Sequence, residues 1–361
     1  MNKPLRVGII GTGIGLRQVA PGFVRAGAEV TAVSGSSIER AREHVGDLDV
    51  PLITDDYRKV CESDDVDLIC VTTPNEFHIE HMTAALRTNK HVYLEKPVGD
   101  DVAQTRSIAN EKGKTDRLVV VGHQLRFNPY FHKMREVIQA GTIGRVYHVT
   151  MSQCYSYWSD PDIPWIWSFD VEKGGGRRLA LGVHLVDLAR YLLNEEAAAI
   201  ASSMDPVHCT RLSEGEPRET FASDFFSATL SFPHTTVDMS TTASAKTGES
   251  FDVVVRGELG DITFDLTNKL QFHDGESSQP LVDQTSEEKY KSVGGVSIFW
   301  DSFTYYAQEI VDAIATGQHT IPLASTVEDA IKNMEVLDAA LRSSQNGTRE
   351  LLAPWLANRY S

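Results

Sequence analysis

The feature that most constrains the fold is a glycine-rich turn near the start of the chain. An apolar run, Arg6–Ile10, leads directly into Gly11-Thr12-Gly13-Ile14-Gly15, and a helical pattern follows. A buried strand, a glycine turn and a helix in this order are typical of the first βα unit of a dinucleotide-binding sheet. The third small residue of the usual spacing would fall at Leu16, so Gly15 has to replace it one position early. A glycine turn that holds no ligand is the alternative interpretation.

Short apolar runs alternate with amphipathic helical stretches as far as Gly122. The runs are Leu5–Ile10, Glu29–Val33, Leu68–Thr72, His91–Leu94 and Leu118–Val121. Nearly all their residues are apolar, as in strands that are buried on both faces. We therefore expect an α/β fold in which residues 1–123 form a Rossmann domain with a doubly wound parallel sheet.

The pattern changes after Gly122. Strand-like segments now alternate polar and apolar residues, at Val146–Cys154, Phe225–Phe232, Thr236–Thr242, Phe251–Val255 and Ile262–Leu266. Helical patterns lie at Pro129–Ala140, Leu181–Leu193, Ser297–Thr316 and Ser325–Ser343. The alternation predicts an antiparallel sheet with one face wet or covered by a partner. Residues 124–361 are thus expected to form an α+β domain with a large, mostly antiparallel open sheet.

Charge and composition argue against several classes of protein. The 361 residues carry a formal net charge of -16, which disfavours binding to nucleic acid or to an anionic membrane surface. No stretch of about 18 apolar residues and no signal-peptide core occurs, so we expect a cytoplasmic protein. The four cysteines form no C-x-x-C pair, and the histidines of His78-Ile79-Glu80-His81 lack the spacing of a zinc helix. We predict no metal site.

The end of the second strand bears on the choice of dinucleotide. An NAD enzyme usually carries an Asp or Glu about 20 residues beyond the glycine turn, where it binds the ribose 2′-hydroxyl. Here the sequence reads Val33-Ser34-Gly35-Ser36-Ser37, with Arg40 close behind. Hydroxyl groups and a guanidinium suit a 2′-phosphate, so we predict NADP rather than NAD. A plain Ser-Gly turn that caps the next helix is the alternative.

A lysine follows the fourth of these apolar runs. His91–Leu94 leads into Glu95-Lys96-Pro97, and ligands in such sheets lie at the carboxyl ends of the strands. With this motif the chain resembles the Gfo/Idh/MocA family, which is named after glucose-fructose oxidoreductase, inositol dehydrogenase and MocA. The resemblance extends over nearly the whole chain. It includes Thr73-Pro74 with His78, then Gly122–Pro129, Gly141–Gly144, Gly174–Gly176, Gly182–Asp187 and Thr326–Ala330.

The resemblance implies hydride transfer between a nicotinamide cofactor and a secondary alcohol carbon of a sugar, cyclitol or related diol. It makes Lys96 and His184 the catalytic residues, on either side of the reacting carbon. A neutral imidazole with a pKa of about 6.5 suits the hydroxyl proton, and a lysine of lowered pKa can share the relay. Asp187 either orients the His184 ring or belongs to helix capping and packing. The resemblance also implies a homodimer or homotetramer.

The expected site is large and has two parts. The residues predicted to contact the cofactor are Gly11, Thr12, Gly13, Ile14, Gly15, Ser34, Gly35, Ser36, Ser37, Arg40, Thr73, Pro74, Asn75, His78, Glu95, Lys96 and Pro97. The residues predicted to line the substrate pocket are Arg126, Asn128, Tyr155, Trp158, Trp165, Trp167 and Asp187. Aromatic and amide side chains suit a polyhydroxylated ring, although they suit an ordinary core as well.

Two features depart from the pattern of the family. Many members carry an aspartate where this chain has Ala180, and the missing carboxylate removes a contact to a substrate hydroxyl. A catalytically weak NADP-binding sensor or regulatory protein is therefore the alternative function. Arg177 and Arg178 either contact an anionic group of the substrate or stand at a solvated helix entrance.

Overall fold

The computed structural model describes residues 3–267, 269–282 and 298–352. They form two compact units, the first made of residues 3–128 and 298–332 and the second of residues 129–267, 269–282 and 333–352. The sequence-based boundary assigned the helix at Ser297–Thr316 to the second domain, whereas its contacts place it in the first; Ser297 itself lies outside the described residues. No helix in the described part of the chain is long and apolar enough to cross a membrane.

A six-stranded sheet forms the centre of the first unit, in the order β3-β2-β1-β4-β5-β6. Its strands are β1 (Arg6–Ile10), β2 (Glu29–Ser34), β3 (Leu52–Thr54), β4 (Leu68–Val71), β5 (His91–Leu94) and β6 (Val119–Val121). All neighbouring strands run parallel. The predicted Rossmann fold is confirmed. The short strand β3 is an addition that the sequence pattern did not reveal.

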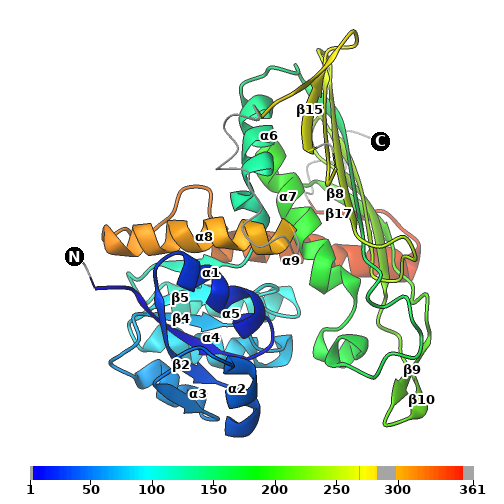
Figure 1. Cartoon of the computed structure of the whole chain (residues 1–361). Coiled ribbons are helices and arrows are strands. Elements are labelled where there is room, and N and C mark those ends of the chain that lie inside the picture. The colour runs from blue at the N-terminus through cyan, green and yellow to red at the C-terminus, as the bar shows by residue number, and fades with distance from the viewer. Residues whose placement is uncertain (1–2, 268, 283–297, 353–361) are drawn as a thin grey trace. The chain divides into compact units, whose positions relative to one another are not determined.

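Helices cover both faces of this sheet. They are the π-helix η1 (Gly15–Val19), α1 (Ala20–Arg25), α2 (Ile38–Val45), α3 (Tyr57–Glu62), η2 (Asn75–Phe77), α4 (His78–Arg87), α5 (Val102–Lys112), η3 (Gln124–Phe127) and α8 (Ile298–Ala315). Residues of α1, α2 and α8 pack into one apolar core, and residues of α3, α4 and α5 pack into the other. Figure 1 shows α8, in orange, beside α1, in blue.

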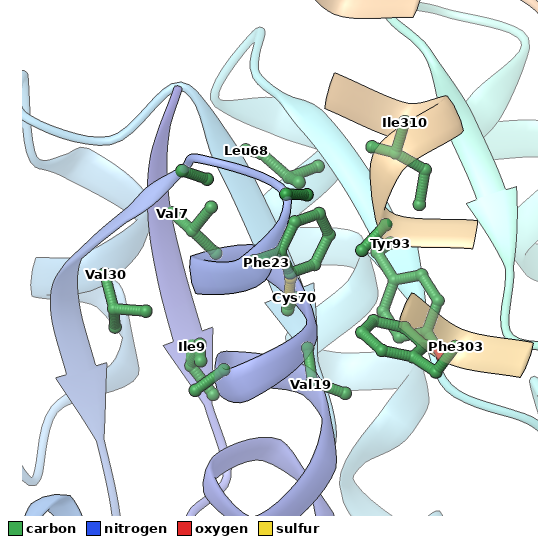
Figure 2. Packing of buried hydrophobic residues seen from close by; sticks show 14 of the residues in the cluster. Val7, Ile9, Val19, Phe23, Val30, Leu68, Cys70, Tyr93, Phe303 and Ile310 are labelled. Atoms are coloured by element: carbon green, nitrogen blue, oxygen red, sulfur yellow. The ribbon is translucent and has the colours of Figure 1, made fainter. Parts of the chain in front are cut away.

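The apolar face of α8 completes one of these two cores. The Phe303 ring meets Phe23 and Tyr93 edge-on, with ring centres 5.6 and 5.3 Å apart. Ile310 belongs to the same cluster, and Figure 2 shows these side chains converging with residues of β1 and β4 such as Val7 and Leu68. A segment from late in the chain therefore closes the core of the parallel sheet.

The second unit contains a nine-stranded sheet in the order β16-β15-β14-β13-β7-β12-β11-β8-β17. Its strands are β7 (Val146–Cys154), β8 (Ala199–Ser203), β11 (Phe225–Ser231), β12 (Thr236–Thr242), β13 (Ser250–Gly257), β14 (Asp261–Asp265), β15 (Lys269–His273), β16 (Ser278–Pro280) and β17 (Glu350–Leu351). Only β7 and β12 pair in parallel among these described strands. The predicted large, mostly antiparallel sheet is confirmed, with more strands than the alternation indicated.

Successive residues of the central strands face opposite sides of this sheet. In β7, Val149 and Met151 are buried, whereas Thr150 and Ser152 are half-buried. The helices of the unit are α6 (Pro129–Gln139), α7 (Val183–Leu193) and the part of α9 (Val327–Asn346) from Asn333 onward. The buried face receives α6, whose Phe131 ring lies 5.4 Å from that of Phe251 in β13. The opposite face is rich in serine and threonine.

Shorter elements lie between the long strands and helices of the second unit. They are η4 (Trp167–Phe169), η5 (Val171–Lys173), the π-helix η6 (Arg178–Gly182) and the hairpin of β9 (Thr210–Ser213) and β10 (Glu216–Glu219). A small apolar cluster of Trp158, Phe169 and Ala243 lies in this region. The π-helix η6 runs without a break into α7.

Candidate functional site

The glycine turn follows β1 at the carboxyl edge of the parallel sheet. Gly11 has a φ of +108°, which a residue with a side chain rarely adopts, and its N–H donates to Ser34 O at 2.9 Å. A Cβ on Gly15 would lie 2.3 Å from Thr72 Oγ1 and 2.8 Å from Ile9 Cγ2. Gly15 therefore allows η1 to pack closely on β1 and β4. In the usual motif the third glycine has this role. Gly13, by contrast, is exposed and nothing lies within 4 Å of where its Cβ would be.

The strand β2 ends at the buried Ser34, and the helix α2 begins four residues later. Ser37 Oγ accepts a hydrogen bond from the Arg40 N–H at 3.2 Å and thus caps α2, as the alternative interpretation expected. Ser36 and the Arg40 side chain are exposed, and the described residues offer Arg40 no ion pair. Sequence reasoning missed His44 of α2, whose Nδ1 lies 2.9 Å from Thr12 Oγ1 and so ties α2 to the glycine turn.

The loop after β4 lies beside the glycine turn, because β1 and β4 are neighbours. Thr72 Oγ1 donates to the carbonyl oxygens of Ile10 and Gly11 at 3.0 and 2.9 Å. The ring of His78 is buried, with Nε2 2.7 Å from Thr73 O and Nδ1 2.7 Å from Pro97 O. Burial lowers the pKa of His78 to about 4, although the two carbonyl oxygens act in the opposite direction. His78 thus connects the loops after β4 and β5, and contact with a cofactor stays a prediction for it.

The loop after β5 carries Lys96, which is half-buried and joined to Pro97 by a cis peptide bond. Tyr93 Oη donates to Glu95 Oε1 at 2.7 Å, and the Lys96 N–H donates to Glu95 Oε2 at 3.1 Å. Burial raises the pKa of the Glu95 carboxyl, while the charge of Lys96 acts to lower it. The side chain of Glu95 therefore fixes the backbone that presents Lys96.

Two predicted substrate residues lie at the end of the first unit's N-terminal segment. Arg126 forms an ion pair of 3.3 Å with Asp329 and donates to Leu323 O at the same distance. Asn128 Nδ2 donates to Ser302 Oγ at 3.1 Å. Both side chains are buried and contact segments from late in the chain. These contacts give them structural roles, and substrate contact stays a prediction.

In the second unit, α7 carries His184 at its second position. His184 and Asp187 are both buried. Asp187 Oδ1 accepts from Asn333 Nδ2 at 2.9 Å, and Asn333 Oδ1 accepts from Arg190 Nη1 at 2.7 Å. This network ties α7 to α9. Sequence reasoning missed Asn333, since no motif marks it, and an orienting role of Asp187 toward His184 stays a prediction.

The predicted aromatic residues differ in exposure. Tyr155 and Trp158 are buried, and Tyr155 Oη accepts from Gln153 Nε2 at 3.1 Å. Trp165 packs under the guanidinium of Arg218, whose Cζ lies 3.7 Å from its ring centre. Trp167 is 38% exposed. Trp158 and Trp165 both contact Phe169 edge-on and so belong to the small apolar cluster.

Arg177 and Arg178 have different surroundings. Arg177 is only 4% exposed, so a solvated helix entrance is the wrong interpretation for it. Its Cζ lies 3.6 Å from a ring centre of Trp158, and its Nη1 donates to Tyr157 Oη at 2.7 Å. Arg178 instead pairs with Asp338 at 3.5 Å and donates to Leu337 O.

Comparison with known proteins gives two matches to family models. Residues 5–123 match the model described as "Oxidoreductase family, NAD-binding Rossmann fold". Residues 135–351 match the model described as "Oxidoreductase family, C-terminal alpha/beta domain". The two matches follow one another along most of the chain.

Individual relatives are distant. "Inositol 2-dehydrogenase 1" of Saccharopolyspora erythraea is 26% identical over 353 residues, which are 95% of each chain. The "Uncharacterized oxidoreductase YrbE" of Bacillus subtilis is 27% identical over 202 residues, 55% of this chain and 57% of that one. The "1,5-anhydro-D-fructose reductase" of Ensifer adhaerens is 30% identical over 203 residues, 55% of this chain and 60% of that one. The last two alignments thus span little more than half of each relative.

Solved structures share the fold over almost the whole chain. An oxidoreductase domain protein from Kribbella flavida has a TM-score of 0.87 at 23% identity, with 97% of this chain and 100% of that one covered. Levoglucosan dehydrogenase in complex with NADH and L-sorbose has a TM-score of 0.88 at 19% identity, with coverage of 98% and 100%. At such identities the likeness shows the fold alone.

Proposed function

The chain belongs to the Gfo/Idh/MocA family of oxidoreductases, and we propose that it transfers a hydride between a nicotinamide cofactor and a secondary hydroxyl or keto group of a sugar, cyclitol or related diol. The observation that carries the proposal is the arrangement at the carboxyl edge of the parallel sheet. The glycine turn after β1 and the Lys96 loop after β5 flank β4, which pairs with both strands. Relatives named as inositol dehydrogenases support the substrate class.

The residues of the first unit fit a dinucleotide. The space over Gly13 leaves room for a pyrophosphate against the backbone, and the N–H groups at the start of η1 suit its charge. Bound there, a nicotinamide dinucleotide supplies the group that accepts or donates the hydride. The backbone of Gly11–Gly15 binds the phosphates, and Thr73, Pro74, Asn75 and the Glu95–Pro97 loop border the nicotinamide half.

NADP is the preferred cofactor in this proposal. The segment after β2 offers two exposed groups, the Ser36 hydroxyl and the Arg40 guanidinium, and no carboxylate stands among residues 34–38. A 2′-phosphate there gains charge-assisted hydrogen bonds, whereas a carboxylate would repel it. NAD is the alternative, and the levoglucosan dehydrogenase structure contains NADH.

Proton transfer falls to Lys96 and His184. When an alcohol is oxidised, its hydroxyl proton has to leave as the hydride departs. In the proposal, as the family resemblance implies, the imidazole of His184 accepts this proton and Lys96 shares the proton relay. Glu95 and His78 act by holding the Lys96 loop. Of the predicted substrate residues in the second unit, Tyr155 and Trp158 are proposed to line the substrate pocket, and Asp187 is proposed to orient the His184 ring.

The test is turnover by the purified protein. NADP or NAD is mixed with a panel of sugars, aldonates and inositols, and absorbance at 340 nm is followed. Formation of reduced cofactor with any member, faster with NADP, is the expected result. Binding of NADP is measured separately by fluorescence titration. Tight binding without turnover across the panel, also in the reductive direction with the keto compounds, supports the alternative of a sensor, which Ala180 favours. If the protein shows neither turnover nor binding of NADP, the proposal is wrong.

A homodimer or homotetramer is the proposed assembly, formed through the serine- and threonine-rich face of the nine-stranded sheet. Ser152 and Ser240 face each other across β7 and β12 at its centre, with their hydroxyl oxygens 3.4 Å apart. Light scattering after size exclusion gives the mass in solution. The double substitution S152R/S240R places two charges there and is expected to give a monomer. If the parent protein is a monomer, the proposed assembly is wrong. The cytoplasmic location expected from the sequence stays a prediction.

A further inference from the structure

A buried arginine in the second unit has a charge that the described residues do not balance. Arg177 follows the three glycines Gly174–Gly176, and its N–H donates to Ser223 O at 2.8 Å. Its guanidinium is enclosed by Trp158 and Tyr157, as described above. Burial lowers the pKa of Arg177, yet a guanidinium stays protonated at neutral pH. A buried charge of this kind is costly unless an anion pairs with it.

The carboxylate whose charge acts on Arg177, that of Asp224, is already paired with another arginine. Asp224 is 2% exposed and pairs at 3.2 Å with Arg211, a second buried arginine. Its carboxylate also accepts from Ser244 Oγ at 2.8 Å and from the N–H groups of Val207 and His208. Asp224 thus pairs with Arg211 and forms no ion pair with Arg177. Within the described ranges no acidic side chain forms an ion pair with Arg177.

Arg177 also has a donor to spare. Its Nη1 is used by Tyr157, while its Nε is buried and finds no acceptor among the described residues. The Nε and Nη2 edge of a guanidinium carries two parallel N–H groups, which match the two oxygens of a carboxylate. A carboxylate would accept a hydrogen bond from this Nε and would also balance the charge of the guanidinium. Because no carboxylate of the described residues does so, the partner would belong to a bound ligand.

Neighbouring groups suit the hydroxyl groups of such a partner. Gln153 and Thr241 face each other across β7 and β12 on the buried side of the sheet, and Gln153 Oε1 and Thr241 Oγ1 both lack a hydrogen-bond partner in the described part of the chain. Gln153 binds Tyr155, whose ring centre lies 5.1 Å from that of Tyr157. A line of contacts thus runs from these two polar groups to the guanidinium of Arg177.

We infer that Arg177 determines specificity by binding a carboxylate of the substrate, so that the substrate is a polyhydroxylated acid rather than a neutral sugar or cyclitol. The inference rests on the proposed function, since it names the class of compound that the enzyme oxidises or reduces. Gln153 and Thr241 bind hydroxyl groups of the same molecule. The π-helix that Arg177 precedes leads directly into α7, which carries His184.

The test compares matched acids and neutral compounds with the full-length protein and NADP. Uronates, aldonates and cyclitol carboxylates are each paired with the uncharged amide or polyol of the same configuration, and sugar phosphates form a third arm. The acids are expected to have a kcat/KM about 100-fold above that of their neutral partners. R177Q is expected to raise KM for the acids about 100-fold with little change in kcat, and R177K is expected to be intermediate. R178Q, which alters the adjacent ion-paired arginine, is the matched control and is expected to resemble the parent.

Several results would overturn the inference. They are a preference of the parent protein for neutral compounds, a preference for phosphates, and an R177Q variant that affects acids and amides equally. If circular dichroism shows that R177Q does not fold, the parent protein alone provides the test. The measured quantity is then the ratio of kcat/KM for each acid to that for its amide. If no compound is turned over, cofactor binding tests the proposed function, and the acid-specific rise in melting temperature with NADP present tests Arg177.

Discussion

Nδ1 of His78 lies 2.7 Å from the carbonyl oxygen of Pro97. The same ring reaches Thr73 O, so one buried side chain connects the loops that follow β4 and β5. Since Pro97 is the residue after Lys96, the position of the imidazole determines where the lysine loop is held. His78 is in this sense a positioning residue for the proposed chemistry.

Replacing His78 with alanine tests this link. Because the pKa of His78 is lowered to about 4, the ring is neutral near pH 7 and its single N–H donates to one of the two carbonyl oxygens. The variant H78A removes this bond, which is expected to cost about 1–3 kcal/mol of the free energy of unfolding, measured in urea. We also expect kcat to fall about tenfold with KM nearly unchanged, because the loop moves without leaving the site. H81A, three residues further along α4, is the control. Equal losses in both variants would mean that His78 has only a packing role.

Substitution of Lys96 tests the proton relay. K96A is expected to lower turnover about 10²–10⁴-fold while the dissociation constant of NADP changes little. Fluorescence titration gives the affinity and stopped-flow absorbance gives the rate. The exposed Lys114 provides the control variant K114A. An undiminished rate in K96A removes this lysine from the mechanism.

Two glycines of the same turn are expected to respond in opposite ways. G15A places a methyl group against Thr72 and Ile9, which is expected to lower the free energy of unfolding by about 1–3 kcal/mol. G13A points its methyl group into open space, so stability is expected to stay unchanged while NADP affinity falls. Denaturant unfolding and fluorescence titration separate the two effects. A stable G13A with full affinity would exclude close approach of the pyrophosphate at Gly13.

Arg40 is expected to select the 2′-phosphate. R40E replaces attraction by repulsion, so the affinity for NADP is expected to fall at least about tenfold while that for NAD is retained. The control is R42Q, since Arg42 is also exposed on α2 but lies outside the predicted contacts. If R40E binds both cofactors as the parent does, NADP recognition does not involve this side chain.

The stability of the first unit is expected to depend on pH through His91. Burial is the main cause that lowers its pKa to about 4, with the charge of Arg117 next, and its Nδ1 accepts from the Leu118 N–H at 3.1 Å. Between about pH 6.5 and 4 the His91 side chain is protonated in the unfolded chain but neutral in the folded chain. The free energy of unfolding therefore falls as the pH drops from about 6.5 to 4. H91N has an amide oxygen that can accept the same hydrogen bond. The variant is expected to reduce the number of protons taken up on unfolding, which the slope of stability against pH measures, by somewhat less than one. An unchanged slope, read from urea titrations, contradicts the assignment.

The sequence predicted those parts of the fold that short-range patterns encode. The strand, the glycine turn and the following helix lie within Arg6–Arg25, so periodicity and spacing identify them. The motif around Lys96 was equally local. The strand β3 escaped prediction because three residues are too few to show a period. The helix at 298–315 was predicted, but an apolar stripe does not say which core it joins, and the partners of Phe303 are Phe23 and Tyr93, far away in the sequence.

The candidate site was predicted less completely for a related reason. Arg177 was visible as a charged residue after a glycine run, but its burial depends on Trp158 and Tyr157 folding over it. The network of Asp187, Asn333 and Arg190 joins two helices whose sequences carry no mark of their contact. Whether a charged side chain is exposed to solvent, paired with a counter-ion or buried without one depends on contacts between segments that are distant in the sequence. Residue spacing does not predict such contacts.

The place of α8 in the first core has a consequence for biosynthesis. A ribosome that has made β1 to β6 has still to make every strand from β7 to β16 before Ile298 emerges. Until then Phe23 and Tyr93 lack the side chains of Phe303 and Ile310 that cover them in the finished protein (Figure 2). The first unit therefore cannot complete this core until β7 to β16 of the second unit have been made, and nascent chains that stall there expose this apolar surface to chaperones and to one another.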